Sequence, residues 1–273
     1  MDGLETYPVR ESNREAFVSL PARQSPSKSN ATSIEAHDRR TFLIVGAGAA
    51  GSMAAKTLRD DGFKGKLIVV DPVREEPIDR TMLSKMVLTD RTPLSGVELK
   101  ALDGLNVTRI KASVVALSST HNHVVLDNGK KLPFDAALVA TGGTPKLLED
   151  VQSGPVYTIR HAADVRHIRA KAHKNSHAVV VGTSFIGLEA ASALRQRGLK
   201  VTVVGREKLP FEKQFGGKIA KAILSLHKSK GVEFLLGADI MEVSWRQIIV
   251  RKGSKQSAVD ADLVILGVGV TPT

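Results

Sequence analysis

Residues 46–51, with the sequence Gly-Ala-Gly-Ala-Ala-Gly, form a loop suited to binding phosphate groups. The loop follows the apolar run 42–45, which is typical of a buried strand, and precedes residues 49–58, which have a helical pattern. There, the first glycine makes the tight turn, the second lets a pyrophosphate approach the backbone, and the third lets helix and strand pack closely. Phosphates bind the free N–H groups of the helix N-terminus. The spacing predicts a dinucleotide site made by Gly46, Ala47, Gly48, Ala49, Ala50 and Gly51.

An acidic residue lies at the position from which dinucleotide-binding folds contact the ribose. Residues 66–70 are expected to form the next strand, and Asp71 follows them, 20 residues beyond Gly51. A carboxylate in this position accepts hydrogen bonds from ribose hydroxyls in dinucleotide-binding folds. The order of strand, glycine turn, helix, strand and acid makes the motif far more specific than the glycines alone.

A second loop, residues 182–187, has the sequence Gly-Thr-Ser-Phe-Ile-Gly and carries Ser184 in place of the middle glycine. The extra Cβ and hydroxyl crowd the point where a phosphate approaches, although the hydroxyl itself can donate a hydrogen bond. The strand after this loop is followed by Arg206, which suits a 2′-phosphate and NADPH, and Glu207, which suits a free 2′-hydroxyl and NADH. Both alternatives stay open. The nucleotide contacts expected here are Gly182, Ser184, Phe185, Ile186, Gly187, Arg206 and Glu207.

The elements that must position these loops are short apolar strands alternating with helical segments. The first series has strands at 42–45, 66–70, 113–117 and 124–126, a buried strand at 136–140, and a helix at 49–58. The second series has strands at 178–181, 201–204, 233–236 and 263–266, a hairpin strand within 241–250, and helices ending at 195 and 230. This alternation predicts an α/β fold with parallel sheets and helices on both faces. Because the series restarts once, we expect two Rossmann-like domains.

Composition excludes several classes of protein. The chain has 273 residues and no cysteine, which excludes disulfides, thiolate-held iron–sulfur clusters and a Cys-x-x-Cys redox pair within it. The eight histidines form no metal-binding pattern, the nearest spacings being 121/123 and 173/177. No apolar run reaches the roughly 18 residues of a membrane span, and the N-terminus lacks a signal pattern. We expect no metal, no membrane span and a cytoplasmic location, with the mitochondrion as the alternative.

The positive charge is concentrated in the second half of the chain. The net charge is +11, and residues 151–273 hold 19 basic and 9 acidic side chains. Such a basic surface attracts nucleotide phosphates, nucleic acid or an acidic protein partner, or is simply solvated. Nucleic acid remains an alternative partner without a motif to support it, because no aromatic-interleaved basic patch is visible.

Four segments resemble one family of flavoproteins. They are 77–85 (Pro-Ile-Asp-Arg-Thr-Met-Leu-Ser-Lys), 140–143 (Ala-Thr-Gly-Gly), 159–160 (Ile-Arg) and 266–272 (Leu-Gly-Val-Gly-Val-Thr-Pro). Over residues 41–273 the chain resembles the apoptosis-inducing-factor-like and ferredoxin-reductase-type FAD-dependent NAD(P)H oxidoreductases of the pyridine nucleotide-disulfide reductase superfamily. The resemblance implies two Rossmann-like FAD/NAD(P)-binding domains followed by a C-terminal interface domain.

The same resemblance implies roles for individual residues. Arg80, Lys85 and Arg160 would contact FAD, and Val114 would lie against its adenine end. Glu189 would pair with Lys85 near the flavin ring, so these two are the candidate catalytic residues. Thr141 and Gly142 would also contact FAD, and Gly269 would lie near the nicotinamide nucleotide. Hydride would pass from NAD(P)H to FAD, and electrons would then reach an iron–sulfur protein or domain of ferredoxin or Rieske type.

The domain boundaries expected from the resemblance are as follows. Residues 1–20 are interpreted as the remnant of a Rieske-type domain, on the match of residues 2–9, and 21–40 as a linker. Residues 41–150 form the first segment of the FAD domain, 151–266 the NAD(P) domain, and 267–273 the return to the FAD domain. The second flavin motif and interface domain are missing, so we expect a chain truncated at both ends. The alternative function is a weakly active or inactive nucleotide-binding or interaction protein with a DNA-binding or cell-death role.

Overall fold

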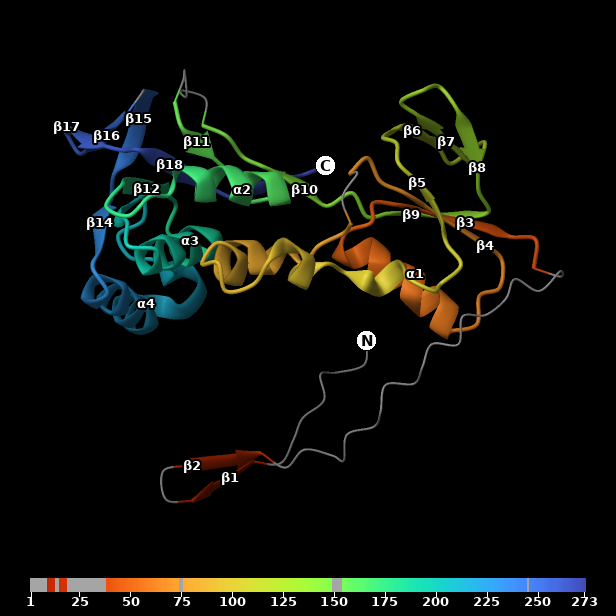
Figure 1. Cartoon of the computed structure of the whole chain (residues 1–273), viewed down its shortest axis with the longest axis horizontal. Helices are drawn as coiled ribbons and strands as arrows, with labels where there is room; N and C mark the ends of the chain where they lie inside the picture. The colour runs from red at the N-terminus through yellow and green to blue at the C-terminus, as the bar shows by residue number, and fades with distance from the viewer. Residues whose placement is uncertain (1–8, 13–14, 19–37, 74–75, 149–153, 245) are drawn as a thin grey trace.

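The computed structural model describes residues 9–12, 15–18, 38–73, 76–148, 154–244 and 246–273. Near the N-terminus, β1 (Val9–Ser12) pairs antiparallel with β2 (Glu15–Val18). Of the Rieske-like match at residues 2–9, all but Val9 lie outside the described residues, as does most of the expected linker. Two lobes follow, each built on a parallel sheet, and they lie on either side of the segment coloured yellow (Figure 1).

The first lobe is built on a four-stranded parallel sheet with the order β5-β4-β3-β9. Its strands are β3 (Thr41–Val45), β4 (Lys66–Val70), β5 (Thr108–Ile110) and β9 (Ala136–Val139), and α1 (Ala49–Asp60) connects β3 to β4. Side chains alternate between the two faces of each strand. Ile44 and Val69 pack toward Ala55 of α1 on one face, in a cluster that Leu102 and Leu105 complete.

The opposite face of this sheet packs against a second, antiparallel sheet. That sheet has the order β6-β7-β8 and consists of β6 (Val114–Ser118), β7 (His123–Leu126) and β8 (Lys131–Pro133). Leu43 and Ile68 share a buried cluster with Val124 and Leu132. The lobe therefore has three layers, of which only one is helical.

The second lobe repeats this plan. Its parallel sheet has the order β11-β18-β12-β13-β14, with β11 (Val156–Tyr157), β12 (His177–Val181), β13 (Lys200–Gly205), β14 (Val232–Leu236) and β18 (Leu263–Leu266). The helices are α2 (Ala162–Lys171), α3 (Phe185–Gln196) and α4 (Glu212–Ser229), the last interrupted at Gly216, where φ is 76°. An antiparallel sheet of β15 (Asp239–Ser244), β16 (Gln247–Lys252) and β17 (Lys255–Asp260) packs on the other face through Val243, Ile248 and Val250.

The sequence-based predictions of the α/β class and of two Rossmann-like parallel sheets are confirmed. The prediction of helices on both faces is wrong, because an antiparallel sheet covers one face in each lobe. The single hairpin strand expected within 241–250 is two strands, and β17 joins them. This third strand was missed because its polar sequence, Lys-Gln-Ser-Ala-Val-Asp, gives no apolar alternation and its side chains are mostly exposed.

The strand expected to be buried at 136–140 is present as β9, but its side chains are exposed. Leu138 and Val139 are 42% and 59% exposed. An apolar run predicts a strand, while its burial depends on what packs over it. β9 pairs with β3 alone among the described strands, so it forms an edge of the first sheet.

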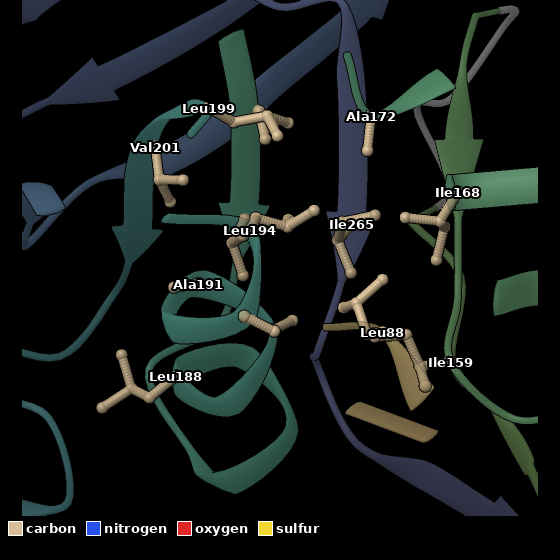
Figure 2. Packing of buried hydrophobic residues seen from close by; sticks show 14 of the residues in the cluster. Leu88, Ile159, Ile168, Ala172, Leu188, Ala191, Leu194, Leu199, Val201 and Ile265 are labelled. Carbon is tan, nitrogen blue, oxygen red and sulfur yellow. The ribbon is translucent and has the colours of Figure 1, made fainter. Parts of the chain in front are cut away.

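The segment between β4 and β5 connects the two lobes. It contains η1 (Arg80–Met82), the π-helical turn η2 (Leu83–Val87), η3 (Leu94–Val97) and η4 (Lys100–Leu102). Leu83 and Val87 belong to the core of the second lobe, and Figure 2 shows Leu88 pointing toward Ile159 and Ile265. This shared core fixes the position of the segment, including its charged residues, relative to the second lobe.

Two further connections run side by side between the lobes. β10 (Gly143–Pro145) pairs antiparallel with β19 (Val270–Pro272). The Thr141 hydroxyl donates to the Thr273 carbonyl at 2.7 Å, so the last residues lie against the first lobe's exit strand. In the part of the chain that the structure describes, no helix is long and apolar enough to span a membrane.

Candidate functional site

The loop between β3 and α1 owes its shape to its two outer glycines. Gly46 has φ of 106°, and a Cβ there would lie 2.3 Å from the Ala140 carbonyl oxygen. A Cβ at Gly51 would lie 1.8 Å from the Gly46 carbonyl oxygen. At Gly48, the N-cap of α1, a Cβ would meet nothing within 4 Å. The space in front of Gly48 is therefore open at a helix N-terminus, where the backbone favours anions.

Asp71 lies beside this loop and stabilises it through a hydrogen bond. Its carboxylate accepts a hydrogen bond from the Ala47 N–H at 2.6 Å and another from the Val73 N–H at 2.8 Å. The same side chain lines the cleft that opens in front of the loop. The structure therefore brings together the glycine loop and the acid that the sequence predicted as partners.

Arginine side chains line the first cleft, in front of this loop. Arg80 and Arg160 both line it, together with Gly48 and Asp71. Burial, and then the like charge of Arg160, lowers the pKa of Arg80. The buried Nε of Arg160 has no hydrogen-bond partner in the structure. Because buried donors are nearly always satisfied, this arrangement suits an anion with several oxygens.

Three more predicted FAD contacts, Gly142, Thr141 and Val114, are not among the residues that line the first cleft. Gly142, with φ of 77°, lies so close to Arg160 that a Cβ would be 2.9 Å from its Nη2. Thr141 is tied to the C-terminal residue through its hydroxyl. Val114 packs against the core below β6. Sequence reasoning missed Arg109 and Lys111, which line the cleft at and just beyond the end of β5.

The pairing expected between Lys85 and Glu189 is present. Lys85 Nζ in η2 lies 3.2 Å from Glu189 Oε1 in α3, and it also donates to the Thr81 carbonyl at 3.0 Å. Ser84 Oγ donates to the other carboxylate oxygen, Glu189 Oε2, at 2.6 Å. Ser84 was missed as a site residue, although it precedes Lys85 in the 77–85 segment. The buried position of this serine in η2 makes it a fixed support for Glu189.

Aromatic side chains line the same cleft as this ion pair. Phe185, the first residue of α3, packs against Phe211 with ring centroids 4.7 Å apart and against Phe215 at 6.2 Å. Phe185 lines a cleft together with Lys85 and Glu189. The structure therefore places Phe185 with the candidate catalytic pair and away from Arg206, which lines a different cleft.

The second glycine loop has the same framework as the first. Gly182 has φ of 112°, and a Cβ there would lie 2.3 Å from the Gly267 carbonyl oxygen. A Cβ at Gly187 would lie 2.2 Å from the Gly182 carbonyl oxygen. Ser184 takes the N-cap position of α3 with φ of −101°, which any residue adopts, and its side chain makes no capping bond. The serine is thus compatible with the loop and leaves an exposed hydroxyl at the helix N-terminus.

A second cleft of about 420 Å³ opens in front of this loop. Gly269, with φ of 102°, lines it opposite the loop, as do Arg206 and Glu207. Arg206 Nε lies 2.6 Å from Asp239 Oδ1, whereas the Glu207 carboxylate accepts from the Thr183 hydroxyl at 3.0 Å. Ile186 is exposed at the start of α3 and is not among the residues that line this cleft.

Neither cleft is built around metal ligands. In the ranges that the structure describes, no group of three histidine, aspartate or glutamate side chains converges as a metal site would require. The chemistry of the two clefts is that of backbone N–H groups, hydroxyls and guanidiniums. Such groups bind phosphate and ribose oxygens.

Solved structures and curated proteins are similar to this chain. The covalent putidaredoxin reductase–putidaredoxin complex matches with a TM-score of 0.81 at 24% identity, covering 86% of this chain and 59% of that chain. Mouse (Mus musculus) apoptosis-inducing factor 3 is 33% identical over 240 residues, which are 84% of this chain and 39% of the relative. The ferredoxin–NAD(+) reductase component of 3-phenylpropionate/cinnamic acid dioxygenase from Photorhabdus laumondii is 31% identical over 240 residues, 84% of this chain and 60% of the relative.

The chain thus spans between 39% and 60% of the length of these relatives. The family model of pyridine nucleotide-disulphide oxidoreductases matches residues 40–273, which include both lobes, both glycine loops and the segment that connects them. The resemblance drawn from the four sequence segments is therefore confirmed. The chain belongs to the pyridine nucleotide-disulphide oxidoreductase family.

Proposed function

We propose that the chain is the nucleotide-binding part of an FAD-dependent NAD(P)H oxidoreductase. FAD occupies the first cleft, with its pyrophosphate at the loop of residues 46–51, and the nicotinamide nucleotide occupies the second. The observation that carries this proposal is the pair Arg80 and Arg160, which share the first cleft while the buried Arg160 Nε lacks a partner. A pyrophosphate supplies the missing acceptors and offsets the repulsion between the two guanidiniums.

The residues around the first cleft fit FAD in several ways. The open space in front of Gly48 lets a pyrophosphate reach the backbone. Asp71 lines the same cleft, where its carboxylate can accept hydrogen bonds from ribose hydroxyls. Gly142 lets the Arg160 guanidinium approach the backbone, because a Cβ at Gly142 would lie 2.9 Å from Arg160 Nη2. Val114 as a contact of the adenine remains a prediction. When bound, FAD supplies the chemistry of a hydride acceptor and one-electron donor.

The protein's own contribution is to position charges and rings. Lys85 places a cation at the junction of the two lobes, and Glu189 with Ser84 orients it. Phe185 packs against Phe211 and Phe215 and lines the same cleft as this ion pair. Hydride transfer needs no protein acid or base, so the effect of these residues lies in alignment and electrostatics. In this assignment residues 41–150 serve FAD, 151–266 serve the nicotinamide nucleotide, and 267–273 return to the first lobe.

The electron acceptor in this proposal is an iron–sulfur protein or domain of ferredoxin or Rieske type. Two relatives support it by name, one being a ferredoxin–NAD(+) reductase component and the other a reductase joined to putidaredoxin. The chain has no cysteine, so the acceptor group cannot be a dithiol of this chain.

The first test asks whether the purified chain binds FAD. Titration calorimetry of FAD into protein freed of flavin then measures the affinity. We expect Arg160→Gln to weaken FAD binding by about tenfold or more, since it removes a charge-assisted contact. Lys171→Gln, on the adjoining helix and exposed, is the matched control and should bind as the parent does. Failure of the parent chain to bind FAD under any condition would contradict the assignment of the first cleft.

The second test is reduction of the bound flavin by NADPH or NADH, seen as loss of its visible absorbance. Bleaching supports the oxidoreductase. A chain that binds FAD yet stays oxidised with both nucleotides would instead support the alternative of a nucleotide-binding or interaction protein. Retention on DNA that weakens with added salt would point to the nucleic-acid role.

A further inference from the structure

We propose that the second cleft selects a nucleotide with a 2′-phosphate, NADPH, over NADH, and that Gly205 and Arg206 are the residues that determine this specificity. This selectivity rests on the proposed function of the second cleft, and it specifies which of the two nicotinamide nucleotides the cleft prefers. It follows from comparing equivalent positions of the two lobes in this one chain.

Strand register identifies the equivalent positions. In the first sheet Val45 pairs with Val70, and Gly46 N–H then donates to the Val70 carbonyl at 2.8 Å. In the second sheet Val181 pairs with Val204, and Gly182 N–H donates to the Val204 carbonyl, also at 2.8 Å. The residue after Val70 is Asp71. Its counterpart after Val204 is therefore Gly205.

The position of the ribose-binding acid is thus vacant in the second lobe. A carboxylate at the end of this strand accepts from the 2′-hydroxyl of NADH and repels the 2′-phosphate of NADPH. Gly205 has no side chain, so it neither accepts a hydrogen bond from the 2′-hydroxyl nor repels the 2′-phosphate. Arginine next to this position is the usual partner of a 2′-phosphate, and Arg206 follows directly.

A packing contact keeps the acid out. A Cβ at Gly205 would lie 2.3 Å from Thr183 Cγ2, and Thr183 is only 5% exposed. In the first loop the residue equivalent to Thr183 is Ala47, whose small side chain leaves room for Asp71. The two lobes therefore carry two matched pairs, Ala47 with Asp71 and Thr183 with Gly205.

Charge at the mouth of the second cleft also favours a phosphate. The Arg206 side chain is 78% exposed, with Nε on Asp239 Oδ1 at 2.6 Å. Arg251 Nη2 lies 3.9 Å from the other oxygen of Asp239, so one carboxylate is shared between two guanidiniums. A guanidinium has five N–H donors, so Arg206 can hold Asp239 and a phosphate together.

Glu207 is the residue that would oppose this selectivity. Its carboxylate lies near the loop, where it accepts from the Thr183 hydroxyl at 3.0 Å. Its backbone is held by Gly237, whose N–H donates to the Glu207 carbonyl at 3.1 Å. Glu207 stands two residues beyond the position of the acid, and its carboxylate serves Thr183. In the proposal it anchors the loop, and Arg206 contacts the ligand.

The test uses 2′,5′-ADP and 5′-AMP, which differ only in the 2′-phosphate and need no bound flavin. In calorimetric titrations we expect 2′,5′-ADP to bind about tenfold or more tightly than 5′-AMP, as charge-assisted hydrogen bonds to a phosphate are worth that much. Arg206→Leu should remove this difference by lowering the affinity for 2′,5′-ADP. Arg246→Leu is the control, because Arg246 is 73% exposed, is ion-paired with Asp262 and lies outside the cleft lining.

A double substitution should reverse the preference. Thr183→Ala with Gly205→Asp transplants the pair found in the first lobe, and Gly205 has no left-handed φ that would forbid aspartate. We expect 5′-AMP to bind more tightly than 2′,5′-ADP to this variant. If the variant does not fold, Arg206→Leu alone decides the proposal.

The outcomes separate this proposal from the proposed function. Equal affinities of the parent chain for the two probes, or an Arg206→Leu variant that keeps the difference, would overturn the selectivity while the nucleotide cleft stands. A Glu207→Gln variant that loses 5′-AMP binding would overturn it too, because Glu207 would then hold the ribose. Binding of neither probe would overturn both this proposal and the assignment of the second cleft.

Discussion

The two glycine loops of this chain share a framework and differ at the middle residue of the loop and at the residue that ends the following strand. In both, the first and last glycines meet a backbone carbonyl oxygen within 2.3 Å of where a Cβ would be, so the chain itself requires them. The middle position faces open space in the first loop and tolerates Ser184 in the second. The outer glycines are therefore required by the fold, whereas we propose that the middle residue and the strand-end acid determine which ligand binds.

The largest effect should come from the outer glycines. Gly51→Ala and Gly187→Ala place a Cβ 1.8 Å and 2.2 Å from a carbonyl oxygen, so helix and strand must separate. We expect each to lower the free energy of unfolding by about 3 kcal/mol, the upper range for overpacking. Chemical denaturation measures this change. The matched control is Gly48→Ala, expected within about 1 kcal/mol of the parent because its Cβ meets nothing.

The strand-end residues should show the next largest difference. Asp71→Ala leaves the Ala47 and Val73 N–H groups without their acceptor, so we expect a loss of about 2 kcal/mol in the free energy of unfolding. In the second lobe Glu207→Ala removes a single hydroxyl contact and should cost less than about 1 kcal/mol. Equal losses in the two variants would show that Asp71 does not support its loop.

Much of the framework behind this comparison was predictable from sequence. The first and last residues of the strands 66–70 and 263–266 were predicted correctly. A continuous apolar run between polar turns indicates a buried strand in a chain where strands and helices alternate. The exposure of β9 was not predictable, since its apolar run is like that of a buried strand and only the neighbouring layers decide burial.

Residues of the candidate site were predictable where they belong to a sequence motif. They were not predictable where only tertiary packing brings them together. The glycines, Asp71 and the Lys85–Glu189 pair were found from spacing and resemblance. Ser84 was missed because its hydrogen bond to Glu189 joins residues 105 positions apart. The Thr183–Gly205 contact was missed for the same reason, because it becomes visible only when β12 and β13 are placed in register.

The junction of the lobes should affect rate and leave stability nearly unchanged. Lys85 and Glu189 are partly exposed, so Glu189→Gln should alter the free energy of unfolding by less than about 1 kcal/mol. We expect flavin reduction to slow by about tenfold, because Lys85 loses its orientation. Rapid-mixing spectroscopy measures this rate. Glu242→Gln, at an exposed glutamate of β15, serves as the control. A Glu189→Gln variant with the parent's rate would remove Glu189 from the positioning role.

The smallest effect should come from exchanging the middle residues of the loops. Gly48→Ser and Ser184→Gly should each change the free energy of unfolding by less than about 1 kcal/mol, because both are N-cap positions that tolerate either residue. Ligand affinity should respond instead, with FAD binding weakened by Gly48→Ser. A large loss of stability in either variant would contradict the division between fold-determining and ligand-determining positions.

The most direct test of the whole account is reduction of the FAD-loaded chain by NADPH and by NADH at equal concentration. We expect the flavin absorbance to bleach with both nucleotides, faster with NADPH, and Arg206→Leu to remove this difference in rate. A flavin that stays oxidised with both nucleotides, or a chain that cannot be loaded with FAD, would contradict the claim that the two clefts work together.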